Sequence, residues 1–353
     1  MAQPAGMTAR SSGAVTRQGG KEARIVFPVM KRLARAYLRK PVEFAPGAAV
    51  SWLGMHEDVT VVTSTHALAA IAPALASSSP RVMQDPPIEV AALDALVPSI
   101  DTPWIAGIGA GRVMDASKYL ALRSRRKLCL IPSALSTTSW LNMAIALRKD
   151  GKLHFPGNIH ASKTIVDPEF ICKAPLSLTL GGLVDILAAC TAVTDWVLSH
   201  ETTGEKISTR GVAEFTAMMN DILSNKAKYT GEPAVVIRAV HDTFLEALAL
   251  CGASFSGRPV EGSEHFLYYL AEETCNRRFV HGEIIAMMML VALRLQGSRA
   301  MVEPARVKDF VEGVGVKCTP RALNISREEL ERVLRGAQAF VVDRGHPYSI
   351  LNG

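Results

Sequence analysis

Two histidines begin successive apolar helical patterns in the second half of the chain. His265 follows Gly-Ser-Glu and His281 precedes Gly-Glu, so the two stand sixteen residues apart, too far for one helix face. Two imidazoles at successive helix starts can converge on one cation if an anionic ligand arrives from elsewhere. The alternative interpretation is that each is an ordinary polar residue of a helical protein.

Asp185 is the candidate for that anionic ligand. It ends the motif Gly-Gly-Leu-Val-Asp (181–185), which we place at the start of a long apolar helical pattern. A carboxylate among apolar residues is costly to bury unless it is paired or bound to a metal. An exposed Asp in a first helical turn, stabilised by the helix dipole, is the competing interpretation.

A glycine-rich turn in the first half has the composition of a phosphate-binding site. Gly-Ile-Gly-Ala-Gly (107–111) follows a predicted strand and opens a predicted helix. Glycines there let the backbone approach a pyrophosphate, whose charge is met by amides at the helix N-terminus. A tight turn without a ligand is the alternative. The strand that ends at 63–65 has no terminal Asp or Glu, which leaves NADP possible beside NAD.

The elements that must position these residues fall into two groups. Strands alternate with helices up to residue 132, a pattern typical of a parallel α/β sheet. We expect a disordered basic tail over residues 1–22, an α/β dinucleotide-binding domain over 23–172, and an all-helical metal- and substrate-binding domain over 173–353, with the ligand cleft between the domains. The helical patterns of the second domain span 178–200, 211–225, 232–251, 264–274, 282–295, 303–314 and 327–343.

Composition restricts the class of protein. Of the 353 residues, 48% are hydrophobic and 20% charged, as in soluble globular proteins. No uninterrupted apolar run reaches the roughly 18 residues of a membrane span, so no such span is expected. Six scattered cysteines favour reduced thiols in a cytoplasmic protein.

The positive charge is concentrated at the beginning of the chain. Residues 1–40 contain nine Lys or Arg and one Glu, a net charge of +8, while the whole chain carries +6. A transit peptide fits this Arg- and Ser-rich composition, but we favour a tail followed by a basic surface helix over about 28–39. Aromatic residues make up only 6% of the chain, so we expect no nucleic-acid partner.

Seven short motifs across residues 41–353 occur in the order of one family. The chain thereby resembles the dehydroquinate synthase-like, iron-containing alcohol dehydrogenase superfamily, and within it most closely the sn-glycerol-1-phosphate dehydrogenases. The motifs are Gly-x-Gly-Ala-Gly-x-x-x-Asp-x-x-Lys-Tyr (107–119), Ile-Pro-Ser-Ala-x-Ser (131–136), Gly-Gly-Leu-x-Asp (181–185), Asp-Trp (195–196), Arg-Pro-x-x-Gly-Ser-Glu-His (258–265), His-Gly-Glu (281–283) and Pro-Tyr-Ser-Ile-Leu (347–351).

The resemblance implies an enzyme that reduces a small, phosphorylated ketone or aldehyde with NAD or NADP. One divalent metal, zinc in the first place and iron or nickel as alternatives, would be held by Asp185, His265 and His281 and would polarise the substrate oxygen. A homodimer is expected. The positions that match the family's cofactor site are Gly109, Ala110, Gly111, Asp115, Lys118, Ser133 and Ser136.

Two catalytic candidates depart from the family pattern. Thr138 stands where the family usually has an Asp that faces the substrate, and Tyr269 where it commonly has a second His near the reacting carbon. An acceptor-only carboxylate has become a hydroxyl, and an imidazole has become a phenol. Because buried groups that pair a substrate hydroxyl discriminate strongly, we expect a substrate other than dihydroxyacetone phosphate.

Two other functions are compatible with the same fold. A sugar-phosphate cyclase of the dehydroquinate synthase type would use NAD transiently, but Lys118 and the motif Gly-Ser-Glu-His (262–265) differ from the cyclase pattern. A non-catalytic relative that serves as a binding protein is the second alternative, and the intact set of metal ligands argues against it.

Overall fold

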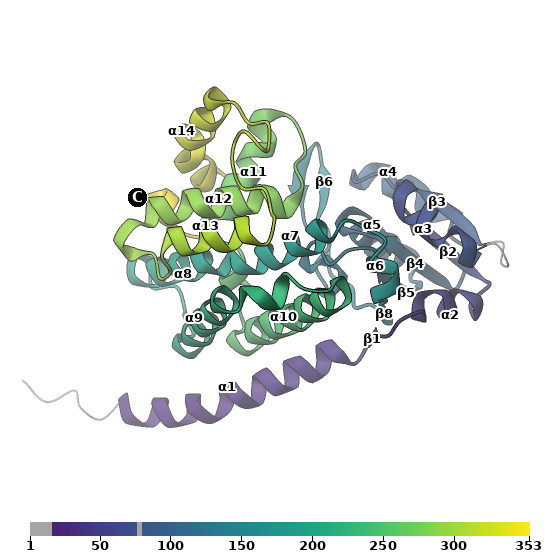
Figure 1. The fold of residues 1–353 in the computed structure, drawn as a ribbon, viewed down its shortest axis with the longest axis horizontal. Helices are drawn as coiled ribbons and strands as arrows, with labels where there is room; N and C mark the ends of the chain where they lie inside the picture. Colours follow the sequence, from purple (N-terminus) through teal and green to yellow (C-terminus); the bar gives the residue numbers. More distant parts are fainter. Residues whose placement is uncertain (1–15, 76–79) are drawn as a thin grey trace, which may run out of the picture.

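The computed structural model describes residues 16–75 and 80–353, in which a strand-containing part and a helical part lie side by side (Figure 1). The first part is built on a six-stranded sheet whose neighbouring strands are all parallel. The alternation of strands and helices predicted this architecture. In spatial order the strands are β1 (Val42–Phe44), β8 (Lys163–Val166), β5 (Lys127–Pro132), β4 (Trp104–Gly109), β2 (Val59–Thr63) and β3 (Arg81–Gln84).

Two separate cores cover the two faces of this sheet. Successive side chains of a strand point to opposite faces, so Val62 and Ile105 pack in the larger core, and Val61 and Ala106 in the smaller one. Because both faces are covered, the central strands consist almost wholly of buried residues. The helices of this part are α2 (Ala48–Gly54), α3 (Thr65–Leu75), α4 (Val90–Leu96), α5 (Gly111–Ser124) and α6 (Pro168–Ile171).

The strand order places a topological switch point between β2 and β4. From β2 the chain crosses to β3 on one side, and it then returns to β4 on the other side of β2. In open parallel sheets, ligands bind beyond the carboxyl ends of the strands at such a point. The glycine turn after β4 therefore lies at the place where a dinucleotide is expected.

A hairpin that the sequence patterns do not predict follows β5. Its strands, β6 (Leu147–Lys149) and β7 (Lys152–His154), pair antiparallel. Asp150 and Gly151 connect them with φ angles of 54° and 75°, as a two-residue turn between twisted strands requires. The Asp-Gly pair was the available signal, but three-residue strands with mostly part-exposed side chains give no clear alternation.

Beyond Val166 the described chain is helical, as the apolar periodicity predicts. The predicted helix over 178–200 is in fact two helices, α7 and α8, separated by a turn at Ala188. Asp185 therefore lies near the end of α7 and not at the start of a helix, where we expected it. The helices are α7 (Leu176–Leu187), α8 (Ala189–Thr203), α9 (Thr209–Ser224), α10 (Pro233–Ser254), α11 (Ser263–Cys275), α12 (His281–Gln296), α13 (Pro304–Gly313) and α14 (Arg327–Asp343).

Helices α7 and α8 together form a segment long and apolar enough, by length and composition alone, to cross a membrane. This segment, Leu176–Thr203, has a mean hydropathy of 1.8, and 83% of its apolar window is buried inside the protein. A search for uninterrupted apolar runs overlooks it because charged residues divide it. Its burial against neighbouring helices is that of a core helix.

Helix α1 (Thr16–Arg39) begins earlier than predicted and packs on the helical part. We expected disorder through residue 22, whereas the helix starts at Thr16; residues 1–15 of the predicted tail lie outside the described part. We also expected the chain from residue 23 to join the α/β domain, but α1 runs along α10 (Figure 1). Ion pairs from Lys31 to Glu214 and Glu246 hold it there.

Candidate metal centre

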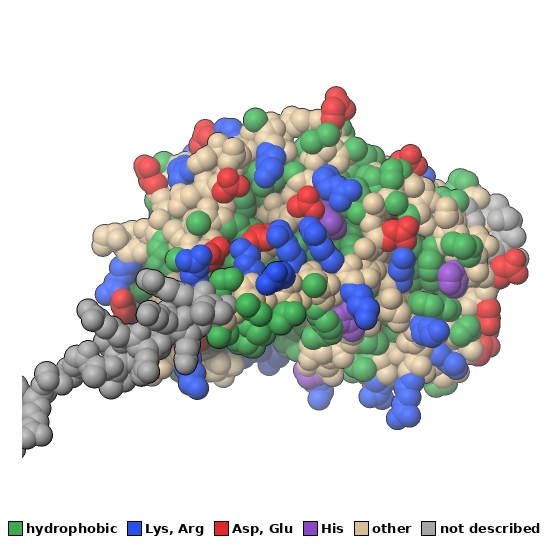
Figure 2. Space-filling model, turned by 90° about the horizontal axis from the view of Figure 1, so that it is seen from below, with side chains coloured by type: hydrophobic (Ala, Val, Ile, Leu, Met, Phe, Trp, Pro, Cys, Tyr) green, Lys and Arg blue, Asp and Glu red, His purple; other side chains and the backbone are tan. Residues whose placement is uncertain are grey.

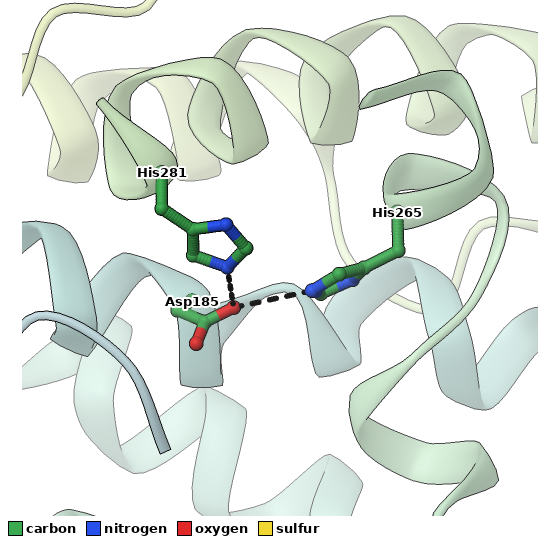
Figure 3. Close-up of side chains that lie close together, drawn as sticks. All are labelled: Asp185, His265 and His281. Carbon is green, nitrogen blue, oxygen red and sulfur yellow. Dashed lines mark hydrogen bonds and ion pairs between the residues drawn. The ribbon is translucent and has the colours of Figure 1, made fainter. Parts of the chain in front are cut away.

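Three side chains from three helices converge in the helical part (Figure 3). Asp185 comes from α7, His265 from the first turn of α11, and His281 from the first residue of α12. The Oδ1 atom of Asp185 lies 3.1 Å from Nε2 of His281 and 3.3 Å from Nε2 of His265. One possible ligand atom from each residue lies within 4.8 Å of the others. The structure thus provides the geometry that the sequence hypothesis requires.

Two glycines let the helices approach closely enough for this convergence. A Cβ atom added at Gly282 would lie 2.3 Å from the Cα atom of Gly181, so the backbones of α7 and α12 touch at this point. Gly181 is one helical turn before Asp185, and Gly282 follows His281 directly. The contact therefore sets the separation of the carboxylate and the imidazole.

Glu264 orients His265, a role that the sequence motifs do not predict. Its Oε1 atom accepts hydrogen bonds from Nδ1 of His265 at 2.9 Å and from the backbone N–H of Gly262 at 2.8 Å. Its other oxygen accepts a hydrogen bond from the Thr191 hydroxyl at 2.5 Å. A carboxylate on Nδ1 fixes the ring and leaves Nε2 to face a cation. The signal in the sequence is a Glu directly before a candidate ligand His.

Burial and pairing have opposite effects on the pKa values in this cluster. Burial alone would lower the pKa of His265, but hydrogen bonds to Asp185 and Glu264 raise it to about 10. Burial would raise the pKa of Asp185, but the charge of His281 and the hydrogen bonds of both histidines hold that pKa well below its usual range. The Asp185 carboxylate is therefore ionised at neutral pH and favours positive charge at the centre of the cluster.

The three donors fit a divalent transition metal. Imidazole nitrogen suits zinc, iron and nickel, whereas calcium and magnesium prefer a set of oxygen ligands. Three protein ligands leave a coordination position for another molecule, as in catalytic sites. The His281 side chain is 24% exposed, so the cluster is open to solvent on the side of this residue.

A second buried carboxylate, Asp195 on α8, secures the start of the helix that carries His265. It accepts hydrogen bonds from the backbone N–H groups of Ser263 at 2.7 Å and Ile350 at 2.9 Å, and from Nε2 of Gln296 at 3.2 Å. Burial and the nearby negative charge of Glu264 raise the pKa of Asp195 to about 6. Asp195 thereby joins three segments that are far apart in the sequence.

Tyr269 lies beside the cluster. Its ring centre is 6.1 Å from that of His265, and its hydroxyl donates a hydrogen bond to Oε1 of Glu261 at 2.7 Å. Burial and the Glu261 carboxylate raise the pKa of Tyr269 well above its ordinary value, so the phenol is protonated at neutral pH.

Thr138 lies in the loop after β5 and accepts a hydrogen bond from Asn142 at 2.7 Å. The catalytic roles of Thr138 and Tyr269 remain predictions.

The N-terminus of α5 fits the pyrophosphate of a dinucleotide. Its N-cap residue, Ala110, has no side-chain hydrogen bond to the helix, and a Cβ at Gly111 would meet no atom closer than 3.5 Å. The first amides of α5 are therefore available to an anion. Gly109 serves packing instead, because a Cβ there would lie 2.8 Å from Cβ of Val113.

Asp115 and Lys118, predicted at the cofactor, form a buried pair under the turn. Nζ of Lys118 lies 3.1 Å from Oδ1 of Asp115 and also donates to Asn142 and to the carbonyl of Ala144. Burial lowers the pKa of Lys118, and the charge of Asp115 opposes this shift. Lys118 has no exposed surface, so the structure gives it the role of holding the loop that carries Thr138. Direct contact with a cofactor stays a prediction.

The loop after β5 links the glycine turn to the metal helix. Ser133 and Ser136, both predicted beside the cofactor, lie in this loop, and the N–H of Ser133 donates to the Gly109 carbonyl at 2.7 Å. In the same loop, the carbonyl oxygen of Leu135 lies 1.8 Å from the place that a Cβ of Gly182 would take. The loop is thus in direct contact with both the strand end and α7.

Asp85 is a further candidate site residue that the sequence motifs do not predict. Strand β2 ends without a carboxylate, but Asp85 follows the neighbouring strand β3 and accepts hydrogen bonds from the Thr65 hydroxyl and, at 3.1 Å, from the Thr65 N–H. These bonds lower the pKa of Asp85. A carboxylate therefore does stand at the carboxyl end of β2, supplied by the next strand. Only the parallel pairing of β2 with β3 reveals it.

Comparison with known proteins identifies relatives in sequence. The pattern of a family described as iron-containing alcohol dehydrogenase matches residues 51–175. Glycerol-1-phosphate dehydrogenase (NAD(P)+) of Pyrobaculum aerophilum is 29% identical over 260 residues, which cover 70% of this chain and 72% of the relative. The enzyme of the same name from Thermoplasma volcanium is 26% identical over 247 residues, covering 70% of this chain and 68% of the relative.

Solved structures share the fold. An iron-containing alcohol dehydrogenase from Thermococcus thioreducens superposes with a TM-score of 0.63 at 14% identity, covering 88% of this chain and 93% of that one. Glycerol dehydrogenase from Schizosaccharomyces pombe gives a TM-score of 0.60 at 20% identity, with 84% and 81% covered. At these identities the likeness concerns the architecture, a parallel sheet followed by a helical part.

Proposed function

Because the chain belongs to the iron-containing alcohol dehydrogenase superfamily and is therefore an oxidoreductase, we propose that it transfers hydride between NAD or NADP and a small carbonyl compound. A divalent cation would be held by Asp185, His265 and His281. The convergence of these three side chains is the observation that carries the proposal.

The chain's own residues prepare the site for this chemistry. A bound cation would supply Lewis acidity toward the substrate oxygen. Glu264 holds the His265 ring in one orientation, and Asp195 fixes the start of α11. Such pre-oriented donors lose little freedom during the reaction. Exposure at His281 gives the substrate a route to the centre.

The cofactor would bind at the switch point of the sheet. The free amides at the start of α5 would meet its pyrophosphate, and the nicotinamide would supply or accept the hydride. The contact between Leu135 and Gly182 supports this arrangement, because it holds the strand ends against the helix that carries Asp185. A fixed spacing between the two halves is what hydride transfer between cofactor and substrate requires.

We propose a phosphorylated ketone or aldehyde as the substrate, in line with the names of the relatives in sequence. Tyr269, next to His265, also lines a hollow of about 350 Å³ that contains charged side chains of both signs. Because Thr138 and Tyr269 replace the usual Asp and His, the substrate should differ from dihydroxyacetone phosphate in its hydroxyl groups. The basic residues of the hollow are Arg148, Lys152, Arg277 and Arg278.

The test is a substrate screen with the purified, zinc-loaded, full-length protein. Phosphorylated and unphosphorylated ketones and aldehydes are offered with NADH and NADPH separately, and coenzyme consumption is followed by absorbance. We expect turnover with a phosphorylated compound, slower turnover of dihydroxyacetone phosphate, and loss of both in Asp185→Asn. Coenzyme consumption also excludes a cyclase, which regenerates its NAD. Turnover that persists undiminished in Asp185→Asn would overturn the proposed centre.

A further inference from the structure

The outward face of α1 carries a stripe of apolar side chains. Val26, Val29, Leu33 and Tyr37 are 52%, 39%, 57% and 55% exposed. Their spacing of three or four residues places them on one side of the helix. Single exposed apolar residues are common on protein surfaces, whereas these four follow one another along one helix and form a small apolar patch.

The opposite face of α1 accounts for its attachment to the protein. Phe27 is buried in the main core, and the Cβ atom of Ala34 lies 2.8 Å from where a Cβ of Gly252 on α10 would stand. Lys31 and Arg35 pair with Glu246 at 2.5 and 2.7 Å. These contacts hold the helix, and of the stripe only Tyr37 adds to them, so Val26, Val29 and Leu33 stay exposed within the part of the chain that the structure describes.

Basic residues accompany the stripe. Arg32, Arg39 and Lys40 are exposed, and none forms an ion pair within the part of the chain that the structure describes. In the space-filling view from below, apolar and basic side chains lie next to one another on this face (Figure 2). Residues 26–40 contain five Lys or Arg and no Asp or Glu.

A hollow of about 320 Å³ lies at the end of the stripe. Lys40, His160 and Ser162 are among the residues that line it, and Tyr37 of the stripe forms part of its wall. The His160 ring packs edge-on against Tyr37 at 4.7 Å. Hydroxyl, imidazole and ammonium groups around one hollow match the hydrogen-bonding needs of a phosphate group.

We propose that α1 docks the protein on an anionic phospholipid bilayer. An amphipathic helix with apolar residues beside Lys and Arg binds in the plane of a membrane interface, where the apolar groups enter and the basic groups meet phosphate. Helix α1 lies outside residues 41–353, the part that resembles a dehydrogenase, so the proposed catalytic function does not explain its surface.

A second copy of the chain fits this surface less well. Two α1 helices packed parallel and face to face would bring Arg32, Arg39 and Lys40 near the same residues of the other copy, which is unfavourable. Four partly exposed side chains offer a few hundred Å² of apolar surface, whereas a stable dimer buries about 800 Å² per partner. The unbalanced positive charge instead complements an anionic lipid surface.

Vesicle flotation with the full-length protein tests the proposal. Vesicles of equal parts phosphatidylglycerol and phosphatidylcholine should bind the protein at least about tenfold more than pure phosphatidylcholine vesicles do, and added salt should weaken the binding. We expect each of two double variants to reduce vesicle binding about tenfold or more. One removes apolar side chains (Val29→Gln with Leu33→Gln), and the other removes basic side chains (Arg32→Gln with Arg39→Gln). Substrate turnover should not change, because these residues lie outside the proposed site.

A matched control lies on α14, where Leu334 is 40% exposed and Arg335 carries an 82% exposed side chain. Leu334→Gln with Arg335→Gln should leave vesicle binding unchanged. Equal binding of wild type and both α1 variants, or equal binding to neutral vesicles, would overturn the proposal. So would a change from dimer to monomer in the Leu33 variant, measured by light scattering, if vesicle binding stayed intact, because a second copy would then be the partner.

Discussion

Gly181 and Gly282 bring two helices into backbone contact at the candidate metal centre. The position of a Cβ on Gly282 is 2.3 Å from Cα of Gly181, closer than any side chain permits. The metal candidates Asp185 and His281 belong to the same two helices and meet beside this contact. Because Gly181 and Gly282 have no side chains, Oδ1 of Asp185 and Nε2 of His281 can lie 3.1 Å apart.

The substitution Gly282→Ala should separate α7 from α12. The added methyl group meets backbone atoms that cannot rotate away, so we expect a loss of stability of about 1–3 kcal/mol and weaker zinc binding by about tenfold or more. Chelator competition and thermal unfolding measure the two effects. Gly336→Ala on α14 is the control, since its nearest neighbour would lie 3.6 Å away; it should leave zinc binding unchanged. Equal zinc affinity of both variants would contradict the argument.

Glu264 should contribute to metal affinity without binding the metal itself. Glu264→Gln keeps the shape of the side chain but removes the charge that favours the His265 tautomer with Nε2 free, so zinc affinity should fall about 10- to 100-fold. Titration against a chelator gives this value independently of turnover. Glu273→Gln, on the exposed side of the same helix, is the matched control and should bind zinc like the wild type. If Glu264→Gln did so too, the orienting role would be wrong.

Asp195 should make the folded protein less stable as the pH rises from about 4 to 6. Its pKa is about 6 in the folded state against 3.8 for an ordinary Asp, so the folded state binds the proton more tightly. The stability that this proton contributes is fully present below pH 3.8 and is lost as the pH rises through about 6. The free energy of unfolding should fall by roughly 3 kcal/mol in total. Urea unfolding of wild type and Asp195→Asn over this range measures it. The difference between the two free energies should change with pH, and parallel curves would contradict the prediction.

Asp85 should favour NADH over NADPH in the proposed cofactor site. Its ionised carboxylate at the end of β2 would repel a 2′-phosphate. In Asp85→Ser the ratio of kcat/KM for NADPH to that for NADH should rise about tenfold or more, because one repulsive charge at close range is worth at least that factor. Asp101→Ser is the control, since Asp101 precedes β4 at the opposite end of the sheet. An unchanged ratio in Asp85→Ser would place the ribose elsewhere.

The sequence predicted the helices and strands whose apolar residues recur at a regular local spacing. Helices such as 327–343 and strands such as 127–132 agree with the structure residue for residue, because an apolar face at regular spacing has only one way to be buried. The meeting of Asp185 with His265 and His281 was expected from the family resemblance. Neither spacing nor composition alone could have chosen these three from the other polar residues.

The features that the sequence did not predict depend on contacts between distant segments. Glu264 acquires its role only when Thr191 of another helix reaches it, and Asp85 reaches Thr65 only through strand pairing. Lys118 was expected at a ligand, but folding encloses it with Asn142. The spacing of these residues does not predict their hydrogen-bond partners, because each partner comes from another part of the chain.

The hydrogen bond from Ile350 to Asp195 affects the order in which the protein can mature during synthesis. The strands of the parallel sheet end at Val166 and are synthesised early. The start of α11, by contrast, waits for Ile350 and for Tyr348, whose carbonyl accepts a hydrogen bond from Arg258. A chain that ends before Tyr348 would therefore contain the strands of the six-stranded sheet but would lack both of these hydrogen bonds.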